Sequence, residues 1–293
     1  MIIRLTQTIF GALCRHRPQL AANIGYWLFR RPSAFNFKTP EEQRLLKDAQ
    51  PILEAAESRI VSTPGGDAFL YHWGQEESPG QPAILLLHGW GGEAGSMAKF
   101  VEPLRQRGFR VLAPDLPGHG KSGSKDVDTL NSLKSILEIT TQFGPVQAIV
   151  GHSLGSLLAC FAVKGHSHIG GRVEAERLAL VSGPVSLASV IDGLGAAAGL
   201  SAEVIGAIRS RADADLSGLL HEADTRQLLD QIDLPVIAYH DREDPFVGFK
   251  TSLVANAGHA RLKASATEGL GHIDILADEA VITAVADFSA SAD

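Results

Sequence analysis

Ser153 stands at the centre of the pentapeptide 151–155, which reads Gly-His-Ser-Leu-Gly. The β-branched apolar run 146–150 precedes it, and an apolar pattern with helical spacing follows over 157–163. A tight turn between a strand and a helix strains its central residue and exposes that residue's side chain beside the helix N-terminus. The free N–H groups there favour a developing negative charge. This context predicts that Ser153 is a nucleophile.

A serine hydroxyl becomes a good nucleophile only when a base takes its proton and a third group orients that base. Later parts of the chain offer both groups. Asp244 lies in the loop after a predicted strand at 234–240, and His272 follows another strand candidate at 261–267. Because Ser153, Asp244 and His272 each follow a different strand, all three can meet at one edge of a parallel sheet.

Attack by a serine on a carbonyl group also needs two backbone N–H groups that bind the oxyanion. The residue after the nucleophile, Leu154, is expected to supply one. The other is expected from segment 88–92, His-Gly-Trp-Gly-Gly, which follows the apolar strand candidate 83–87. Glycine lets a backbone amide approach a substrate without a side chain in the way. We assign the second donor to the N–H of Trp90.

These segments together resemble the motifs of the α/β-hydrolase superfamily. In chain order, the matching motifs are His88-Gly89-Trp90-Gly91-Gly92, Asp115-Leu116-Pro117-Gly118-His119-Gly120-Lys121-Ser122, Gly151-His152-Ser153-Leu154-Gly155, Asp244 with Val247, and Gly271-His272. The resemblance implies a mainly parallel eight-stranded sheet with helices on both faces and a small helical cap. In this superfamily a serine nucleophile points to esterase, lipase, thioesterase or carbon–carbon bond hydrolase chemistry. It points away from the dehalogenases and epoxide hydrolases that use an aspartate nucleophile.

The resemblance also favours one of two candidates in the same loop, Asp241 and Asp244, for the acid that orients the base. The spacing of Asp244 and Val247 matches the Asp-x-x-Val pattern of the superfamily, so we favour Asp244 as the acid of the triad. Some relatives carry the acid after the preceding strand instead, but segment 182–186 contains none.

Other polar residues of the motifs have structural interpretations. Asp115 is expected to fix the loop after its strand. His88 and His119 match positions that organise loops, so neither is expected to act as the base. His152, beside the nucleophile, is expected to be structural or to form part of the pocket wall.

The resemblance implies cleavage of carboxylic esters with short- to medium-chain acyl groups through an acyl-enzyme, with no metal and no cofactor. Thioester hydrolysis uses the same groups and stays open. Carbon–carbon bond hydrolysis would need polar groups in the cap, where the helical pattern 201–211 carries Arg209 and Arg211. Perhydrolase activity on the same triad also stays open, as does an idle hydrolase fold that acts as a binding module. Small soluble esters are the expected substrates.

Length and composition permit one large core, because 45% of the 293 residues are hydrophobic. The net charge of −7 argues against nucleic acid as a partner. Cys14 and Cys160 are far apart in the sequence, so we expect no disulfide and a reducing, cytoplasmic location. The oligomeric state stays open.

The charge is unevenly distributed along the chain. Residues 1–40 contain six basic and no acidic residues, which leaves −13 for the rest. Apolar residues recur there at helical spacing over 2–13 and again over 20–28. A basic amphipathic segment at 1–38 can contact an anionic membrane surface. The alternative, which we favour, is a pair of helices packed on the hydrolase body. Neither a secretory signal nor a membrane-spanning helix is predicted.

Three parts are expected along the chain: an N-terminal helical extension at 1–57, a hydrolase core at 58–183 and 233–293, and a cap at 184–232. Alternating strands and helices in the core are typical of a mainly parallel sheet covered on both faces. Strands are predicted near 58–63, 68–73, 83–88, 109–113, 146–150, 177–182, 234–240 and 260–267, and helices near 95–107, 129–142, 154–164, 249–257 and 273–289. An ordinary crossover with extra helical turns, near 201–211 and 224–231, is the alternative to a cap.

Overall fold

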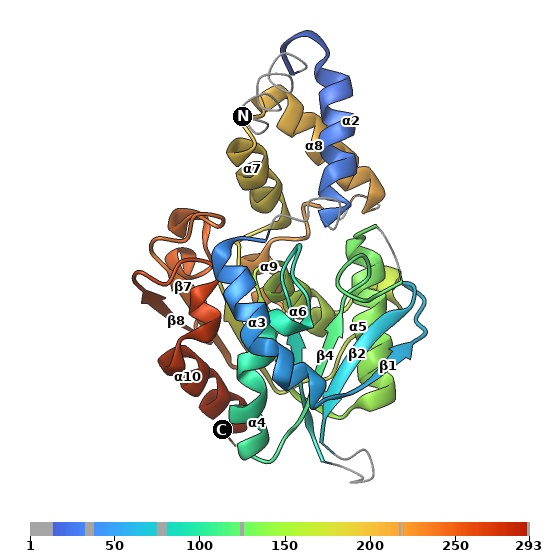
Figure 1. The fold of residues 1–293 in the computed structure, drawn as a ribbon. Helices are drawn as coiled ribbons and strands as arrows, with labels where there is room; N and C mark the ends of the chain where they lie inside the picture. Colours follow the sequence, from blue (N-terminus) through green and yellow to red (C-terminus); the bar gives the residue numbers. More distant parts are fainter. Residues whose placement is uncertain are drawn as a thin grey trace.

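An eight-stranded sheet forms the centre of the molecule (Figure 1). The computed structural model describes residues 14–32, 38–74, 81–123, 126–216, 218 and 220–291. The strands lie in the order β1-β2-β4-β3-β5-β6-β7-β8. β2 is antiparallel to both of its neighbours, and all other pairs are parallel. The bounds are β1 Glu57–Val61, β2 Ala68–Trp73, β3 Ala83–Leu87, β4 Arg110–Asp115, β5 Val146–His152, β6 Arg177–Val181, β7 Val236–Asp241 and β8 Leu262–Thr267. The predicted mainly parallel, eight-stranded sheet is confirmed.

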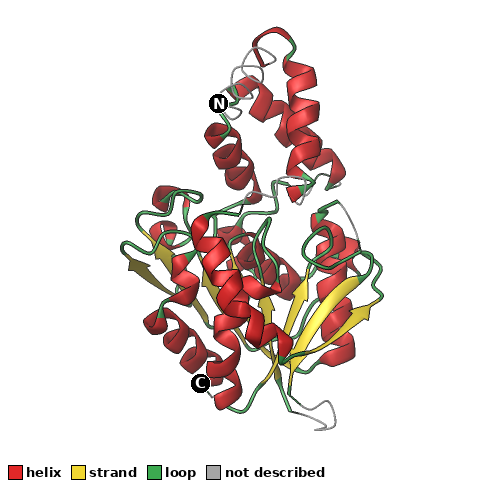
Figure 2. Ribbon diagram, in the orientation of Figure 1, coloured by secondary structure: helices red, strands yellow, loops and turns green. Residues whose placement is uncertain are grey.

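Helices cover both faces of the sheet, so its central strands are buried on two sides (Figure 2). Along β3, Leu85 and Leu87 enter one apolar core, while Ile84 and Leu86 enter the other. This alternation follows from the two-residue period of a strand. The first core includes α5 (Thr129–Phe143), α6 (Leu154–Lys164) and α9 (Thr225–Leu229), and the second includes α3 (Pro40–Glu54), α4 (Val101–Gln106) and α10 (Glu279–Ala290).

The prediction of a helix near 249–257 is wrong. This segment forms two short 3₁₀ turns instead, η4 (Phe249–Thr251) and η5 (Val254–Asn256). Between them, the Ser252 hydroxyl donates to the carbonyl oxygen of Phe249 at 2.7 Å and accepts from a backbone N–H three residues later at 3.1 Å. Such local side-chain bonds to the backbone compete with helical hydrogen bonding.

Two other predicted helices are interrupted. The one near 95–107 begins as the 3₁₀ helix η2 (Ala94–Phe100) and continues as α4. The one near 273–289 is divided at Asp278 into η6 (Asp274–Ala277) and α10. The Asp278 side chain accepts from the N–H of Val281 at 2.9 Å and so caps α10.

Residues 184–232 contain α7 (Leu187–Ala197) and α8 (Ala202–Asp215) in addition to α9. The sequence pattern does not predict α7, because its glycines and alanines give a weak apolar period and a weak propensity signal. A capping box formed by Ser186 and Ser189 begins this helix. α7 and α8 stand beyond the sheet on the same side of the molecule (Figure 1).

Helix α2 (Pro18–Phe29) packs along α8, although the two helices are far apart in the sequence (Figure 1). The Tyr26 hydroxyl donates to Asp215 at the end of α8 at 2.5 Å, and Arg30 donates to the same carboxylate at 3.0 Å. The helical pattern expected over 20–28 is therefore present, whereas the one over 2–13 lies outside the described residues. No helix within the described ranges is long and apolar enough to cross a membrane.

Gly195 of α7 and Gly206 of α8 form a matched pair that tests how closely these helices pack. A Cβ atom on Gly195 would lie 2.7 Å from Cγ1 of Ile205, whereas one on Gly206 would meet no atom within 4 Å. We expect Gly206→Ala to stabilise α8 by about 0.5–1 kcal/mol, because alanine has the higher helix propensity. Gly195→Ala should destabilise the packing of α7 on α8 by about 1 kcal/mol, because the added methyl group overpacks the contact with Ile205. Hydrogen exchange at the α7 and α8 amides measures both effects. Equal stabilisation by the two substitutions would contradict the close packing.

Candidate active site

Ser153 lies in the turn between β5 and α6 with φ 52° and ψ −120°, a strained conformation for a residue with a side chain. Two glycines make this turn feasible. A Cβ atom on Gly151 would lie 2.5 Å from the carbonyl oxygen of Gly155, and one on Gly155 would lie 2.3 Å from the carbonyl oxygen of Leu87. No other residue fits these close approaches. The backbone therefore presents the Ser153 side chain at the first turn of α6.

The turn lies where the strand order of the sheet reverses. β3 and β5 are neighbours, but β4 lies on the far side of β3 and β6 on the far side of β5. Ligands of open α/β sheets bind outside the carboxyl ends of the strands at such a point. Segment 88–92 follows β3 and Ser153 follows β5, so the two meet there. A Cβ atom on Gly89 would lie 2.8 Å from Cβ of Ser153, which shows how closely they approach.

The structure brings His272 and Asp244 together. Nδ1 of His272 donates to Oδ2 of Asp244 at 2.6 Å, so Nε2 of His272 is left without a proton and can accept one. The other carboxylate oxygen of Asp244 accepts from the N–H groups of Phe246 and Val247 at 2.8 and 2.9 Å. Burial opposes ionisation of Asp244. The hydrogen bonds from His272 and from the N–H of Val247, together with the charge interactions with His272 and His240, outweigh burial and lower the pKa of this carboxyl below its ordinary value.

Asp241 is also buried, but its carboxylate serves the backbone. It accepts from the N–H of Glu243 at 2.9 Å, from the hydroxyl of Thr267 at 2.8 Å and from the N–H of Leu270 at 3.0 Å. Burial raises the pKa of Asp241, but these hydrogen bonds outweigh it and lower that pKa overall. Asp241 therefore joins the loop after β7 to the loop after β8, which carries His272.

The imidazole of His88 orients the peptide that contains the expected oxyanion donor. Its Nε2 accepts from the N–H of Leu116 at 3.0 Å, so Nδ1 carries the proton and donates to the carbonyl oxygen of Gly89 at 2.8 Å. That carbonyl shares its peptide plane with the N–H of Trp90. Burial lowers the pKa of His88 to about 4, which keeps the ring neutral. His88 thus has the loop-organising role expected for it.

Both expected oxyanion donors lie in positions where they are available. Within the described part of the chain, the N–H of Trp90 makes no hydrogen bond. Leu154 is the first residue of α6, where backbone N–H groups have no partner within the helix. Trp90 and Ser153 line one cavity, and Leu154 directly follows Ser153.

Two further buried histidines support the loops that carry His272 and Asp244. Nε2 of His152 donates to the carbonyl oxygen of His272 at 3.0 Å, and Nε2 of His240 donates to the carbonyl oxygen of Val247 at 2.8 Å. Burial lowers the pKa of both rings, that of His152 to about 3. His152 fits the structural role expected for it. The sequence does not indicate this role for His240, because a histidine near the end of an apolar strand looks like an ordinary strand residue.

Asp115 fixes the loop after its strand, and His119 bonds within the same loop, as expected. The two carboxylate oxygens of Asp115 accept from the N–H groups of Ala94 and Lys121, each at 2.7 Å. Nδ1 of His119 donates to the carbonyl oxygen of Pro117 at 3.2 Å, and burial lowers the pKa of His119 to about 3. Neither residue bonds to the triad candidates.

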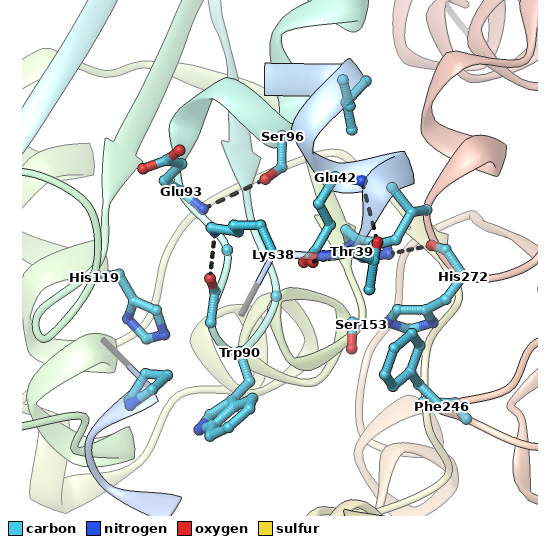
Figure 3. Close-up of a pocket in the computed structure, with 18 of the residues that line it drawn as sticks. Lys38, Thr39, Glu42, Trp90, Glu93, Ser96, His119, Ser153, Phe246 and His272 are labelled. Atoms are coloured by element: carbon cyan, nitrogen blue, oxygen red, sulfur yellow. Dashed lines mark hydrogen bonds between the residues drawn. The ribbon is translucent and has the colours of Figure 1, made fainter. Parts of the chain in front are cut away.

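A cavity of about 360 Å³ opens above Ser153 (Figure 3). Ser153, His152 and His272 form part of its wall, and α7 adds apolar side chains from Val190 and Leu194. Sequence reasoning missed the contribution of the N-terminal extension, because nothing in that segment resembles a motif. It supplies Pro32, Lys38, Thr39, Glu42 and Leu45.

Comparison with known proteins decides the family. The family model described as "Alpha/beta hydrolase family" matches residues 84–284 of this chain. The chain belongs to the α/β-hydrolase family. The resemblance noted in the sequence motifs is thereby confirmed.

Individual relatives match shorter segments. A 2-hydroxy-6-oxononadienedioate/2-hydroxy-6-oxononatrienedioate hydrolase of Cupriavidus pinatubonensis is 34% identical over 133 residues, 42% of this chain and 45% of that protein. A pimeloyl-[acyl-carrier protein] methyl ester esterase of Vibrio campbellii is 40% identical over 90 residues, 30% of this chain and 33% of that protein. The chain thus matches less than half the length of these relatives.

Solved structures show the same fold. An esterase from Exiguobacterium antarcticum superimposes on this chain with a TM-score of 0.59 at 18% sequence identity, covering 80% of this chain and 100% of the esterase. At this level of identity the likeness concerns the fold alone, and the chemistry must be argued from the site.

The two candidate acids can be separated by substitution. We expect Asp244→Asn to lower kcat by about 10³–10⁴-fold, because an amide at this position no longer favours the His272 tautomer with the proton on Nδ1. Asp241→Asn should lower the thermal midpoint of unfolding and change kcat far less, since its carboxylate bonds to the loops after β7 and β8 and to the end of β8 rather than to His272. Steady-state kinetics and melting curves on both variants provide the measurement. A larger loss of kcat in Asp241→Asn would show that the acid is misassigned.

Buried neutral histidines predict a pH dependence of stability. Burial holds the pKa of His88, His119 and His152 at about 4, 3 and 3, below the ordinary 6.5. Below pH 6.5 these three histidines bind protons in the unfolded chain but stay neutral in the folded chain. The free energy of unfolding therefore falls as pH falls toward 5. Each ring contributes up to about 1.4 kcal/mol per pH unit in this window. Urea unfolding at pH 7 and pH 5 measures the loss, and His119→Gln should reduce its slope by about one proton. An unchanged slope in that variant would contradict the burial of a neutral His119.

Proposed function

We propose that this chain is a serine hydrolase that cleaves carboxylic esters of short- to medium-chain acids through an acyl-enzyme intermediate. One observation carries the proposal. Ser153, in a strained turn, lines the same cavity as His272, and Nδ1 of His272 lies 2.6 Å from Oδ2 of the buried Asp244. Membership of the α/β-hydrolase family supports hydrolase chemistry at this site.

In the proposed mechanism, Nε2 of His272 takes the Ser153 proton as Oγ attacks the carbonyl carbon of the ester. The N–H groups of Trp90 and Leu154 donate to the oxyanion of the tetrahedral intermediate. The imidazolium returns the proton to the leaving alcohol as the carbon–oxygen bond breaks. Water, deprotonated by the same nitrogen, then attacks the acyl-enzyme, and the acid leaves as the proton returns to Ser153. Asp244 stays ionised and bonded to Nδ1 throughout.

The part of the cavity wall that α7 supplies favours an apolar acyl group over a polar second carbonyl. α7 contributes Val190 and Leu194 to this wall. Arg209 bonds instead to Asp192 at 3.3 Å, on the exposed side of α8. Arg211, which bonds to a residue of α2, does not line the cavity either. These contacts argue for ester hydrolysis over carbon–carbon bond hydrolysis.

We assign the cap role to residues 184–232 within the same proposal, between the core segments 58–183 and 233–293. The wall residues supplied by α7 support this division. Residues 1–57 form the N-terminal extension, whose helix α2 packs along α8.

A chain-length series of p-nitrophenyl esters, from acetate to palmitate, tests the proposed function. Turnover should peak at short to medium chains, because the cavity measures only about 360 Å³. Ser153→Ala should lower turnover by about 10³-fold or more. Ser210→Ala, on the exposed surface of α8, is the matched control and should keep wild-type activity.

Labelling by a fluorophosphonate adds a test that needs no knowledge of the substrate. Wild type and Ser210→Ala should be labelled at one serine, and Ser153→Ala should not. Near-native turnover by Ser153→Ala would overturn the assignment of the nucleophile. Absence of both turnover and labelling in the wild type would favour an idle hydrolase fold.

A further inference from the structure

The loop that carries the expected oxyanion donor is held by residues outside the family-matched segment 84–284. The indole N–H of Trp90 donates to the carbonyl oxygen of Phe29 at 2.8 Å, and the two rings stack with centroids 5.9 Å apart. Nζ of Lys38 donates to the carbonyl oxygen of Gly91 at 2.8 Å (Figure 3). The donor N–H of Trp90 directly precedes both contacts along the chain.

This loop needs external support because glycine occupies three of its five positions, residues 88–92. Gly91 adopts φ +72°, a conformation open mainly to glycine, and glycine loses the most conformational freedom on ordering. An oxyanion hole lowers a barrier only when its donors are oriented before the reaction begins. His88 fixes the carbonyl of Gly89 on one side of the donor peptide. The contacts from Phe29 and Lys38 fix its other side.

The backbone of Lys38 is held in place by the start of α3. Lys38 directly precedes Thr39, which caps α3 in a capping box with Glu42. α3 in turn packs on η2, where a Cβ atom on Gly95 would lie 3.0 Å from Leu46. The backbone of Lys38 is therefore held by the core, and its side chain reaches back to the loop.

The end of α2 is anchored in the same way. The carbonyl oxygen of Arg30 accepts from the N–H of Val127 at 2.7 Å, and Arg31 forms an ion pair with Asp126 at 2.5 Å. These bonds hold the backbone next to Phe29 against the loop before α5. The carbonyl oxygen that Trp90 contacts is thus a fixed acceptor.

We propose that Phe29 and Lys38 are positioning residues that orient the Trp90 N–H for the oxyanion; we call this pair of contacts the N-terminal clamp. The inference rests on the proposed serine hydrolase function. It assigns to the N-terminal extension a part in the chemical step, beyond forming the cavity wall. Lys38 acts through the carbonyl of Gly91, and Phe29 through the indole of Trp90.

Substitution of Lys38 separates positioning from substrate contact. Lys38→Met removes the donor and keeps the aliphatic stem, Lys38→Arg restores a donor, and Lys47→Met is the same change at an exposed position of α3. We expect Lys38→Met to lower kcat about tenfold with KM changed less than about twofold, since loss of orientation acts on the transition state. Lys38→Arg should recover most of the loss, and Lys47→Met should match the wild type.

Inhibition by a trifluoromethyl ketone provides a measurement, the Ki, that a purely structural role of Lys38 would leave unchanged. The adduct of the ketone with Ser153 places an oxyanion between the Trp90 and Leu154 amides, so the Ki should rise in Lys38→Met in proportion to the fall in kcat/KM. Trp90→Phe keeps the stacking on Phe29 and loses the indole donor, so it should show the same rise in Ki and fall in kcat/KM as Lys38→Met. This second variant keeps the proposal testable if Lys38→Met does not fold, as judged by its melting curve.

Other outcomes would overturn the clamp. A rise in KM with unchanged kcat in Lys38→Met would show that Lys38 contacts the substrate instead. Wild-type kinetics in both variants would show that the loop needs no such support. The rate of fluorophosphonate labelling tests the clamp even if no ester is turned over, because the phosphonyl oxygen occupies the same site. Failure of the clamp would leave labelling equal in all variants, whereas failure of the proposed function would abolish labelling in the wild type.

Discussion

The active site depends on how closely the chain approaches itself around Ser153. Without side chains at Gly151 and Gly155, the first turn of α6 lies against the ends of β3 and β5, which no larger residue would allow. The same contact accompanies the positive φ of Ser153, which directly precedes the first turn of α6, where backbone N–H groups have no partner within the helix. It also brings the loop after β3 next to Ser153, where Gly89 has no room for a Cβ atom. One steric constraint therefore places Ser153, the proposed nucleophile, and both expected oxyanion donors.

Buried polar side chains then fix each loop by bonding to its backbone. Asp115 and Asp241 each accept several N–H groups, while His88 and His240 donate to carbonyl oxygens. Burial lowers the pKa of both histidines, so they act as neutral, directional donors rather than as charges. Rigid dipoles of this kind cost no reorganisation when charge develops in a reaction. The loops are thus organised by hydrogen bonds that the family motifs only partly reveal.

The sequence predicts the strands well because they are short apolar runs between turn residues, as β2 and β3 show. It predicts α7 poorly, since a stretch rich in glycine and alanine becomes helical through its cap at Ser186 and its packing on α8. The triad candidates stand out because each follows a strand and matches a motif, and the structure brings Asp244 to His272. His240 and Lys38 could not be found that way. Their roles depend on contacts with residues seven and fifty-three positions away, respectively, which no local pattern records.

The N-terminal extension links two parts of the site that the sequence keeps far apart. α2 contacts α8 through Tyr26 and Arg30, which share Asp215, and its last residue, Phe29, accepts from the indole of Trp90. A displacement of α8 would therefore act on the oxyanion loop through one short helix. Because α7 and α8 pack together and α7 lines the cavity, a bulky acyl group that moves them would also disturb the donor peptide. Under the proposed function and the N-terminal clamp, acyl-chain selectivity should arise in kcat as well as in KM. The reason is that α7, which limits the cavity, is connected through α8 and α2 to the contact that orients the proposed oxyanion donor.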